Sequence, residues 1–133
     1  MLSLLKHKNA PTLFQFQLDF TLEDRQREAR SVRKKYPDRV PCVVEVRQKE
    51  PDDGLKLDKK KYLVPNDVTL SQFAFVLRKR MHLNPSKAIF MMIDNQMISG
   101  SVTMRQVYAQ HKGPDDFLYV HIGSENTFGS PFG

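Results

Sequence analysis

Side chains that could do catalytic chemistry are few in this chain, and they are not grouped. Cys42 is the single cysteine and falls in an alternating apolar run, so we expect a buried thiol rather than a nucleophile. The adjacent carboxylates Asp52-Asp53 and Asp115-Asp116 stand in turns, where we expect solvated side chains rather than an acid and base pair. The histidines lack metal-ligand spacing, and we expect surface or helix-end positions for His7, His82, His111 and His121. The residues therefore predict a protein that is not an enzyme and that uses no metal or cofactor.

Charge narrows the class of partner. The net charge of +6 favours acidic partners such as anionic lipid, acidic peptide or nucleic acid. Lysine and arginine gather in three clusters, at 33–35, 59–61 and 78–80. Nucleic-acid binding usually also needs aromatic residues free to stack on bases, whereas most aromatic residues here lie in apolar runs. We therefore expect a solvated basic surface and no nucleic-acid partner.

The length and composition are typical of one domain with mobile ends. The chain has 133 residues, of which 40% are hydrophobic and 27% charged. No run approaches the ~20 apolar residues that cross a bilayer. The first six residues lack the apolar length and the cleavage site of a signal peptide. We expect a cytoplasmic protein.

Hydrophobic periodicity predicts elements in the order helix, strand, strand, helix, strand, helix, strand. Predicted capping boxes begin the helices at Thr21, Thr69 and Thr103. The continuous apolar run 88–93 is typical of a buried central strand. This order suits an α+β sheet covered by helices on one face, which is the outline of a ubiquitin-like β-grasp. The helices are predicted at 21–35, at 69–81 and from Thr103 to Gly113-Pro114, and the strands at 39–47, 60–64, 88–93 and 117–122.

Two of these elements carry more apolar surface than one core needs. The first strand has a valine-rich row on one face, yet Pro41 and Val43 are apolar on the other. On the helix 69–81, Phe73 and Val76 widen the apolar stripe. One interpretation is that the N-terminal helix or arm buries these groups. The other is a pair of pockets beside an exposed strand edge, suited to binding a peptide as an added strand.

Several ordered blocks carry a resemblance to a known family. Over roughly residues 20–129, the chain resembles the autophagy ubiquitin-like modifiers, the family of the GABA-receptor-associated protein and of the light chain of microtubule-associated protein. The length and order of the blocks make the resemblance specific. They are Val32–Pro41, Leu57–Pro65, Gln72-Phe73 with Leu77–Arg80, Phe117–Val120 and Ser124–Gly129.

The resemblance implies a β-grasp with an extra N-terminal helical segment. The chain then divides into an arm at 1–19 that is partly mobile or helical, a ubiquitin-like domain at 20–123 and a flexible tail at 124–133. An autophagy cysteine protease would cut the tail after Gly129, before Ser130, and Gly133 is the alternative acceptor. Activating and conjugating enzymes would then join the glycine to phosphatidylethanolamine, which places the protein in the cytoplasm and on the autophagosome membrane.

The resemblance also implies a surface that binds aromatic-x-x-aliphatic motifs of cargo receptors and adaptors, with microtubules as a further candidate partner. The aromatic side chain would enter a pocket formed by Glu28, Pro41, Val43, Lys61, Leu63 and Phe117. The aliphatic side chain would enter a pocket formed by Tyr62, Val64, Pro65, Phe73 and Val76. Acidic residues flanking the motif would contact Lys35, Arg39 and Lys59.

Departures from the family pattern concern partner preference. Leu18-Asp19-Phe20 stands where the family has a proline before the phenylalanine, and Ala74 replaces a larger residue. Two other functions stay open on the residues alone. One is a binding module that is never conjugated. The other is a basic protein that binds nucleic acid or microtubules with steep salt dependence.

Overall fold

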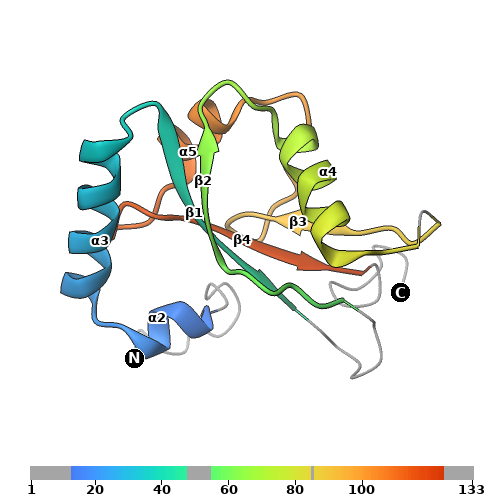
Figure 1. Cartoon of the computed structure of the whole chain (residues 1–133), viewed down its shortest axis with the longest axis horizontal. Coiled ribbons are helices and arrows are strands. Elements are labelled where there is room, and N and C mark those ends of the chain that lie inside the picture. Colours follow the sequence, from blue (N-terminus) through green and yellow to red (C-terminus); the bar gives the residue numbers. More distant parts are fainter. Residues whose placement is uncertain (1–12, 48–54, 85, 125–133) are drawn as a thin grey trace, which may run out of the picture.

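The structure, a computed structural model, describes residues 13–47, 55–84 and 86–124 (Figure 1). The seven predicted elements are present in the predicted order, and a short helix precedes them. Of the predicted arm and tail, residues 1–12 and 125–133 lie outside the described residues, including His7, Gly129 and Ser130, and so does Asp52-Asp53. The elements are α2 (Gln15–Asp19), α3 (Leu22–Lys35), β1 (Arg39–Val46), β2 (Lys61–Pro65), α4 (Leu70–Met81), β3 (Phe90–Met92), α5 (Met104–His111) and β4 (Leu118–Gly123).

The strands form one mixed sheet in the order β2-β1-β4-β3. The two central strands, β1 and β4, are parallel, and β2 and β3 pair antiparallel to them at the edges. The prediction of a central strand at 88–93 is wrong, because only Phe90–Met92 pair, and they pair at an edge. Part of the apolar run serves the core instead: Ile93 is buried after the strand, and Ile89 packs against the same core.

Both faces of β1 are buried, so the expectation of helices on one face is wrong. Val40, Cys42 and Val44 belong to the main core, which α4 and α5 cover. On the opposite face, Val43 belongs to a second core with Phe14, Phe16, Ala29 and Phe117. Successive side chains of a strand face opposite sides of the sheet, and in β1 both sets are apolar. Each face of β1 therefore needs other elements packed on it. Figure 1 shows α3 and α4 flanking the β1–β2 pair on opposite sides.

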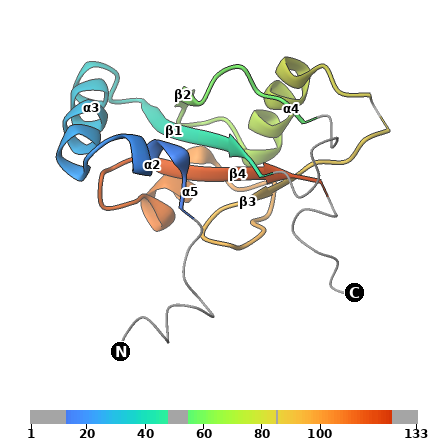
Figure 2. The same cartoon turned by 90° about the horizontal axis from the view of Figure 1, so that it is seen from below.

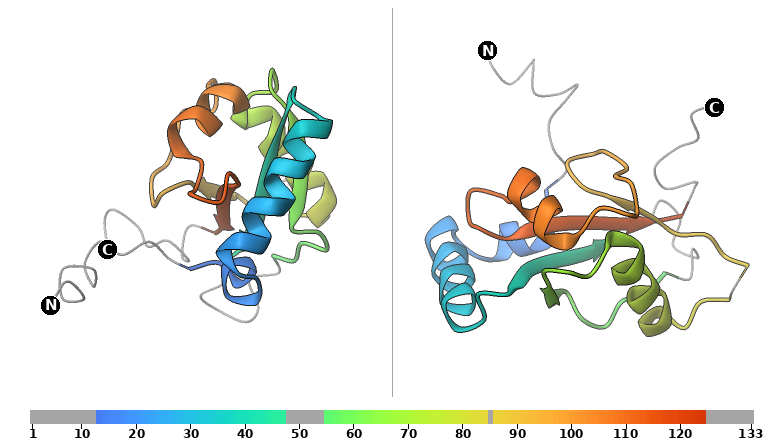
Figure 3. Two further views of the ribbon diagram at one scale, coloured as in Figure 1. Left: turned by 90° about the vertical axis from the view of Figure 1, so that its left-hand side faces the viewer. Right: turned by 90° about the horizontal axis from the view of Figure 1, so that it is seen from above.

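The helix α3 begins with a contact between residues close in the sequence, and few of its side chains are buried. Thr21 Oγ1 accepts a hydrogen bond from the Asp24 N–H at 3.1 Å, as an N-cap does. Of the predicted apolar stripe, Leu22 and Tyr36 remain 43% and 37% exposed, and Ala29 is the buried residue of the helix. Since burial of one methyl group contributes only about 0.8 kcal/mol, polar contacts must hold α3 in place. Figure 3 shows α3 running alongside β1.

The helices α4 and α5 begin with the predicted capping boxes. Thr69 and Gln72 exchange hydrogen bonds at the start of α4, and Thr103 and Gln106 do so at the start of α5. Each box satisfies backbone N–H groups that have no partner inside the helix. The helix α4 ends at His82, whose positive φ of 53° closes it, so the predicted helix-end position of this histidine is confirmed. The buried row of α4 consists of Leu70, Phe73, Leu77 and Met81.

The short helix α2 lies beside α3 at one end of the sheet (Figure 2). Phe14, which precedes the helix, and Phe16 within it are buried, whereas Leu13 and Leu18 stay 64% and 63% exposed. The Glu45 carboxylate accepts the backbone N–H groups of Gln15 at 2.7 Å and Phe16 at 2.9 Å. A side chain of β1 therefore caps α2, which is why local periodicity does not reveal this helix. None of the helices in the described ranges is both long and apolar enough to cross a membrane.

Candidate functional site

A groove of about 400 Å³ separates α3 from the edge strand β2. Its wall is α3, its floor comes from β1 and β2, and the residue before β4 completes it. Apolar side chains lie among charged ones, as in many peptide-binding grooves. The lining residues are Glu28, Val32, Arg39, Pro41, Lys59, Lys61, Tyr62, Leu63 and Phe117.

Five of the six residues assigned to the aromatic pocket meet in this groove: Glu28, Pro41, Lys61, Leu63 and Phe117. Val43 does not line it. Its side chain is 0% exposed in the second core, where Phe16 and Phe117 share its cluster. The placement of Val43 on the pocket surface is therefore corrected, because the N-terminal arm covers that face of β1.

An ion pair crosses the groove. Lys61 Nζ on β2 lies 2.7 Å from Glu28 Oε2 on α3, and their side chains are 52% and 38% exposed. Lys61 Nζ also lies 5.9 Å from the centre of the Phe16 ring. An exposed pair of this kind is worth at most about 1 kcal/mol, so an incoming acidic group can compete for Lys61.

The strand beside the groove has a free edge. β2 is the outermost strand of the described sheet, and it pairs only with β1, with Pro41 opposite Leu63. The backbone groups on its outer side face no strand. A peptide in extended conformation could therefore add to β2 as a further strand and place alternate side chains in the groove.

The residues assigned to the aliphatic pocket divide into buried and exposed members. Tyr62, Val64 and Phe73 belong to the main core, and the rings of Tyr62 and Phe73 meet edge to face at 5.7 Å. Pro65 is exposed, and Val76 on α4 is 49% exposed. The neighbouring Phe75, not selected from the sequence, is 58% exposed. Pro65 on β2 and Phe75 and Val76 on α4 are therefore apolar side chains that the fold leaves exposed.

The three predicted charge contacts rest on aromatic rings. Lys35 Nζ and the Arg39 guanidinium lie 5.6 and 5.4 Å from the centre of the Tyr36 ring, and Lys59 Nζ lies 5.2 Å from that of Tyr62. Within the described ranges none of the three forms an ion pair. Cations held in this way over rings remain able to receive carboxylates.

The reactive side chains that the structure describes outside the groove lie apart from one another. Cys42 is 0% exposed, and burial raises the pKa of its thiol, so the predicted buried thiol is confirmed. In the described part of the chain, no three His, Cys, Asp or Glu side chains could share a metal ion. His111 is only partly exposed at the end of α5, and its Nδ1 lies 2.8 Å from Asp94 Oδ2.

Two sequence interpretations of polar residues are wrong. His121 is not at the surface: it is 7% exposed and stacks on Phe14, with 3.8 Å between ring centres. Burial lowers the pKa of His121 to about 4, with a smaller lowering from Arg47. Asp115 is not solvated: its side chain is 0% exposed and lies 2.6 Å from Arg25 Nη1. Segments that are distant in the sequence bury both groups, so the residues next to them in the sequence do not reveal this burial.

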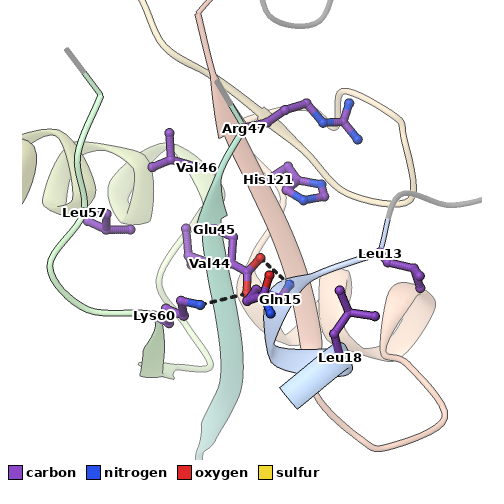
Figure 4. A pocket seen from close by; sticks show the side chains of 10 residues that line it. All are labelled: Leu13, Gln15, Leu18, Val44, Glu45, Val46, Arg47, Leu57, Lys60 and His121. Atoms are coloured by element: carbon purple, nitrogen blue, oxygen red, sulfur yellow. Dashed lines mark hydrogen bonds and ion pairs between the residues drawn. The ribbon is translucent and has the colours of Figure 1, made fainter. Parts of the chain in front are cut away.

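A second pocket, of about 450 Å³, lies between α2 and the end of β1 (Figure 4). Figure 4 shows Glu45 among the residues that line it, with dashed lines to Gln15 and Lys60. Glu45 accepts the backbone N–H of Gln15 and lies 3.4 Å from Lys60 Nζ. Glu45 also receives the N–H of Phe16, so the structure already engages both of its oxygens. We interpret this pocket as the contact region between α2 and the sheet, where Glu45 attaches the helix to β1.

Comparison with known proteins adds the family. The family model described as "Autophagy protein Atg8 ubiquitin like" matches residues 24–129. Autophagy-related protein 8 of Schizosaccharomyces pombe is 47% identical over 118 residues, covering 89% of this chain and 96% of that protein. The chain belongs to the Atg8 family. Autophagy-related protein 8B of Oryza sativa subsp. indica is 48% identical over 114 residues, covering 86% of this chain and 94% of that protein.

The Atg8 assignment also settles the fold. The crystal structure of Trypanosoma brucei ATG8 superposes with a TM-score of 0.79 at 37% identity and covers 89% of this chain and 100% of that one. The ubiquitin-like α+β fold with helices added at the N-terminus is therefore confirmed. This chain is an autophagy protein of the ubiquitin-like class, as the resemblance of its sequence blocks implied.

Proposed function

We propose that this Atg8 protein is a conjugated modifier with two separate working parts. Its tail is cut after Gly129 and joined to phosphatidylethanolamine, and its folded domain recruits partners that carry an aromatic-x-x-aliphatic motif. The protein acts as the substrate of a protease and of activating and conjugating enzymes, and is not itself an enzyme. It moves from the cytoplasm to the autophagosome membrane when the lipid is attached.

The groove between α3 and β2 carries the binding half of the proposal. An extended peptide pairs with the free edge of β2, and its aromatic side chain enters between Pro41, Leu63 and Phe117. The aliphatic side chain, three residues later, reaches the exposed Val76 on α4. Acidic residues beside the motif meet Arg39 and Lys59, which line the groove. Buried apolar anchors supply most of the affinity, and the charges mainly raise the association rate.

The tail carries the conjugation half of the proposal. The match to the family model ends at residue 129, and four residues follow it. Glycine has no side chain to obstruct approach to its carbonyl, which suits a residue that must pass through narrow enzyme channels. We infer that the chain is a precursor in which Ser130–Gly133 mask the acceptor glycine.

Digestion of the full chain with the autophagy protease tests the tail. Mass spectrometry should show loss of residues 130–133 from the wild-type chain and an intact mass for Gly129→Ala. Retention of these residues in the wild type, or equal loss from the variant, would contradict the assignment of Gly129. Membrane recovery that is unchanged in Gly129→Ala would favour a binding module that is never conjugated.

Calorimetry with an aromatic-x-x-aliphatic peptide tests the groove. Leu63→Asp places a charge on the apolar floor and should weaken binding by at least tenfold, or about 1.4 kcal/mol. Met97→Asp is the matched control, because Met97 is 65% exposed in a segment outside the groove. Val43→Asp is unsuitable, since a charge in the second core would unfold the domain. Equal affinities for wild type and Leu63→Asp would refute the groove.

A further inference from the structure

Buried apolar contacts contribute little to holding α3, the wall of the groove, on the domain. Only Ala29 is buried among the 14 residues of α3. Glu28 and Val32, the two residues of α3 that line the groove, lie next to Ala29 and almost one turn after it. An alanine buries little apolar surface, so the position of this wall depends on polar contacts.

The turn before β4 supplies three of those contacts. Three side chains of α3 donate hydrogen bonds to three successive residues of the turn, two of them to carboxylates and one to a carbonyl. This arrangement attaches the polar helix to the ubiquitin-like domain at several points. The contacts are Arg25 Nη1 to Asp115 Oδ2 at 2.6 Å, Gln26 Nε2 to the Pro114 carbonyl at 3.0 Å and Arg30 Nε to Asp116 Oδ2 at 3.1 Å.

The Asp115 carboxylate connects two sides of the groove. Its side chain is 0% exposed, and that of Arg25 is 13% exposed. Oδ2 accepts from Arg25 and from the Tyr119 hydroxyl, and Oδ1 accepts the Phe117 N–H at 2.9 Å. One buried group therefore holds α3 through Arg25 and the backbone of Phe117 directly. Both α3 and Phe117 line the groove.

We propose that the Arg25–Asp115 pair positions the walls of the peptide groove and thereby sets peptide affinity without contacting the peptide. Neither residue lines the groove. The inference rests on the proposed peptide-binding function. Because the pair is buried, removal of one partner would leave the other charged and desolvated. The loss of either side chain should therefore disturb the local structure strongly.

Arg25→Gln tests the pair, and Arg30→Gln is its matched control. Both changes remove one guanidinium of α3 that contacts the turn before β4, but the Arg30 side chain is 64% exposed and that of its partner Asp116 is 26% exposed. In calorimetry on the full chain, Arg25→Gln should weaken binding of the aromatic-x-x-aliphatic peptide by roughly tenfold. Arg30→Gln should change it by less than about twofold. Wild-type affinity in a folded Arg25→Gln protein would overturn the proposal.

A second control separates position from stability. Val107→Ala opens the main core on the α5 side, where Val107 is 1% exposed. Arg25→Gln should accelerate hydrogen exchange at the Phe117 amide, whereas Val107→Ala should leave that amide and the peptide affinity unchanged. If Val107→Ala with an equal loss of unfolding free energy weakens binding equally, the pair acts only through global stability and the proposal fails.

A milder variant keeps the test usable if Arg25→Gln does not fold. Tyr119→Phe removes one donor to Asp115 Oδ2 and keeps the ion pair. It should weaken binding by about threefold and accelerate exchange at Phe117; unchanged values of both would overturn the proposal.

Leu63→Asp distinguishes the two proposals. If the wild type does not bind the peptide, the proposed function fails. If Leu63→Asp abolishes binding and Arg25→Gln does not weaken it, only the positioning role fails.

Discussion

Single residues in this domain owe their chemistry to burial. Asp115 keeps its partners Arg25 and Tyr119 within hydrogen-bond distance in the interior, and burial and the bond to Asp115 together raise the pKa of Tyr119. His121 has the opposite surroundings, an aromatic stack without a bonded carboxylate partner among the described contacts. A neutral imidazole is the form that such surroundings favour.

His121 should make folding stability depend on pH. Its pKa lies near 4 in the folded chain, lowered from 6.5 first by burial and then by Arg47, with Glu45 opposing. Between these values the unfolded chain binds more protons, so stability should fall as the pH drops from 6.5 to 4, by at most about 1.4 kcal/mol per pH unit.

Urea unfolding at several pH values measures this slope. His121→Phe keeps the stack on Phe14 and removes the titration, so its stability should vary less across the same range. All other residues are the same in both proteins, so the comparison between them isolates the histidine. Identical slopes for the two proteins would show that the His121 pKa is not lowered by folding.

At the scale of elements, α2 is the least self-sufficient part of the structure. It has five residues, too few for a stable isolated helix, and its cap comes from Glu45 on β1. Phe14 and Phe16 add apolar burial on the second core. The attachment of α2 to the sheet should therefore depend on the Glu45 carboxylate. We expect that α2 can detach while the rest of the domain stays folded.

Glu45→Ala should release α2 without unfolding the sheet. The change removes two charge-assisted hydrogen bonds to backbone N–H groups and should cost about 2 kcal/mol of local stability. Hydrogen exchange should accelerate at the amides of Gln17, Leu18 and Phe20, while the amides of β1 and β4 stay protected. Lys60→Ala, which removes the other partner of Glu45, is the control and should have little effect. Uniform acceleration across the sheet would contradict a separable α2.

At the scale of the whole molecule, the positive charge of the protein should assist peptide binding at the groove. The net charge is +6, and Arg39 and Lys59 concentrate part of it at the groove. Long-range attraction of this kind raises the association rate and is screened by salt. The dissociation rate depends instead on the apolar anchors.

The association rate with an acidic aromatic-x-x-aliphatic peptide should fall about tenfold between roughly 0.05 and 0.5 M salt, with little change in the dissociation rate. Lys35→Glu should lower the association rate. Lys87→Glu changes the net charge equally, but residues 82–84 and 86–89 lie at the opposite end of the molecule from α3 (Figure 1), so it should lower the rate less. Stopped-flow fluorescence measures both rates. Equal effects of the two variants would show that net charge, and not its position, governs association.

Much of the fold and of the groove could be read from the residues because the signals are local. Thr69 and Gln72 cap α4 within one turn, and the alternation along β1 predicted two apolar faces. The identification of Pro41, Leu63 and Phe117 as one surface came from the resemblance, and the structure places all three in the groove.

The remaining features arise from contacts between distant segments. Arg25 and Asp115 are 90 positions apart, and Glu45 follows the residue it caps, Gln15, by 30. The same kind of packing buried Val43 under the arm and set β3 at an edge. Hydrogen bonding within a turn and alternation along a strand are properties of neighbouring residues, so the chain displays them directly. Burial of a charge depends on which segments meet, and that is established only when the chain folds.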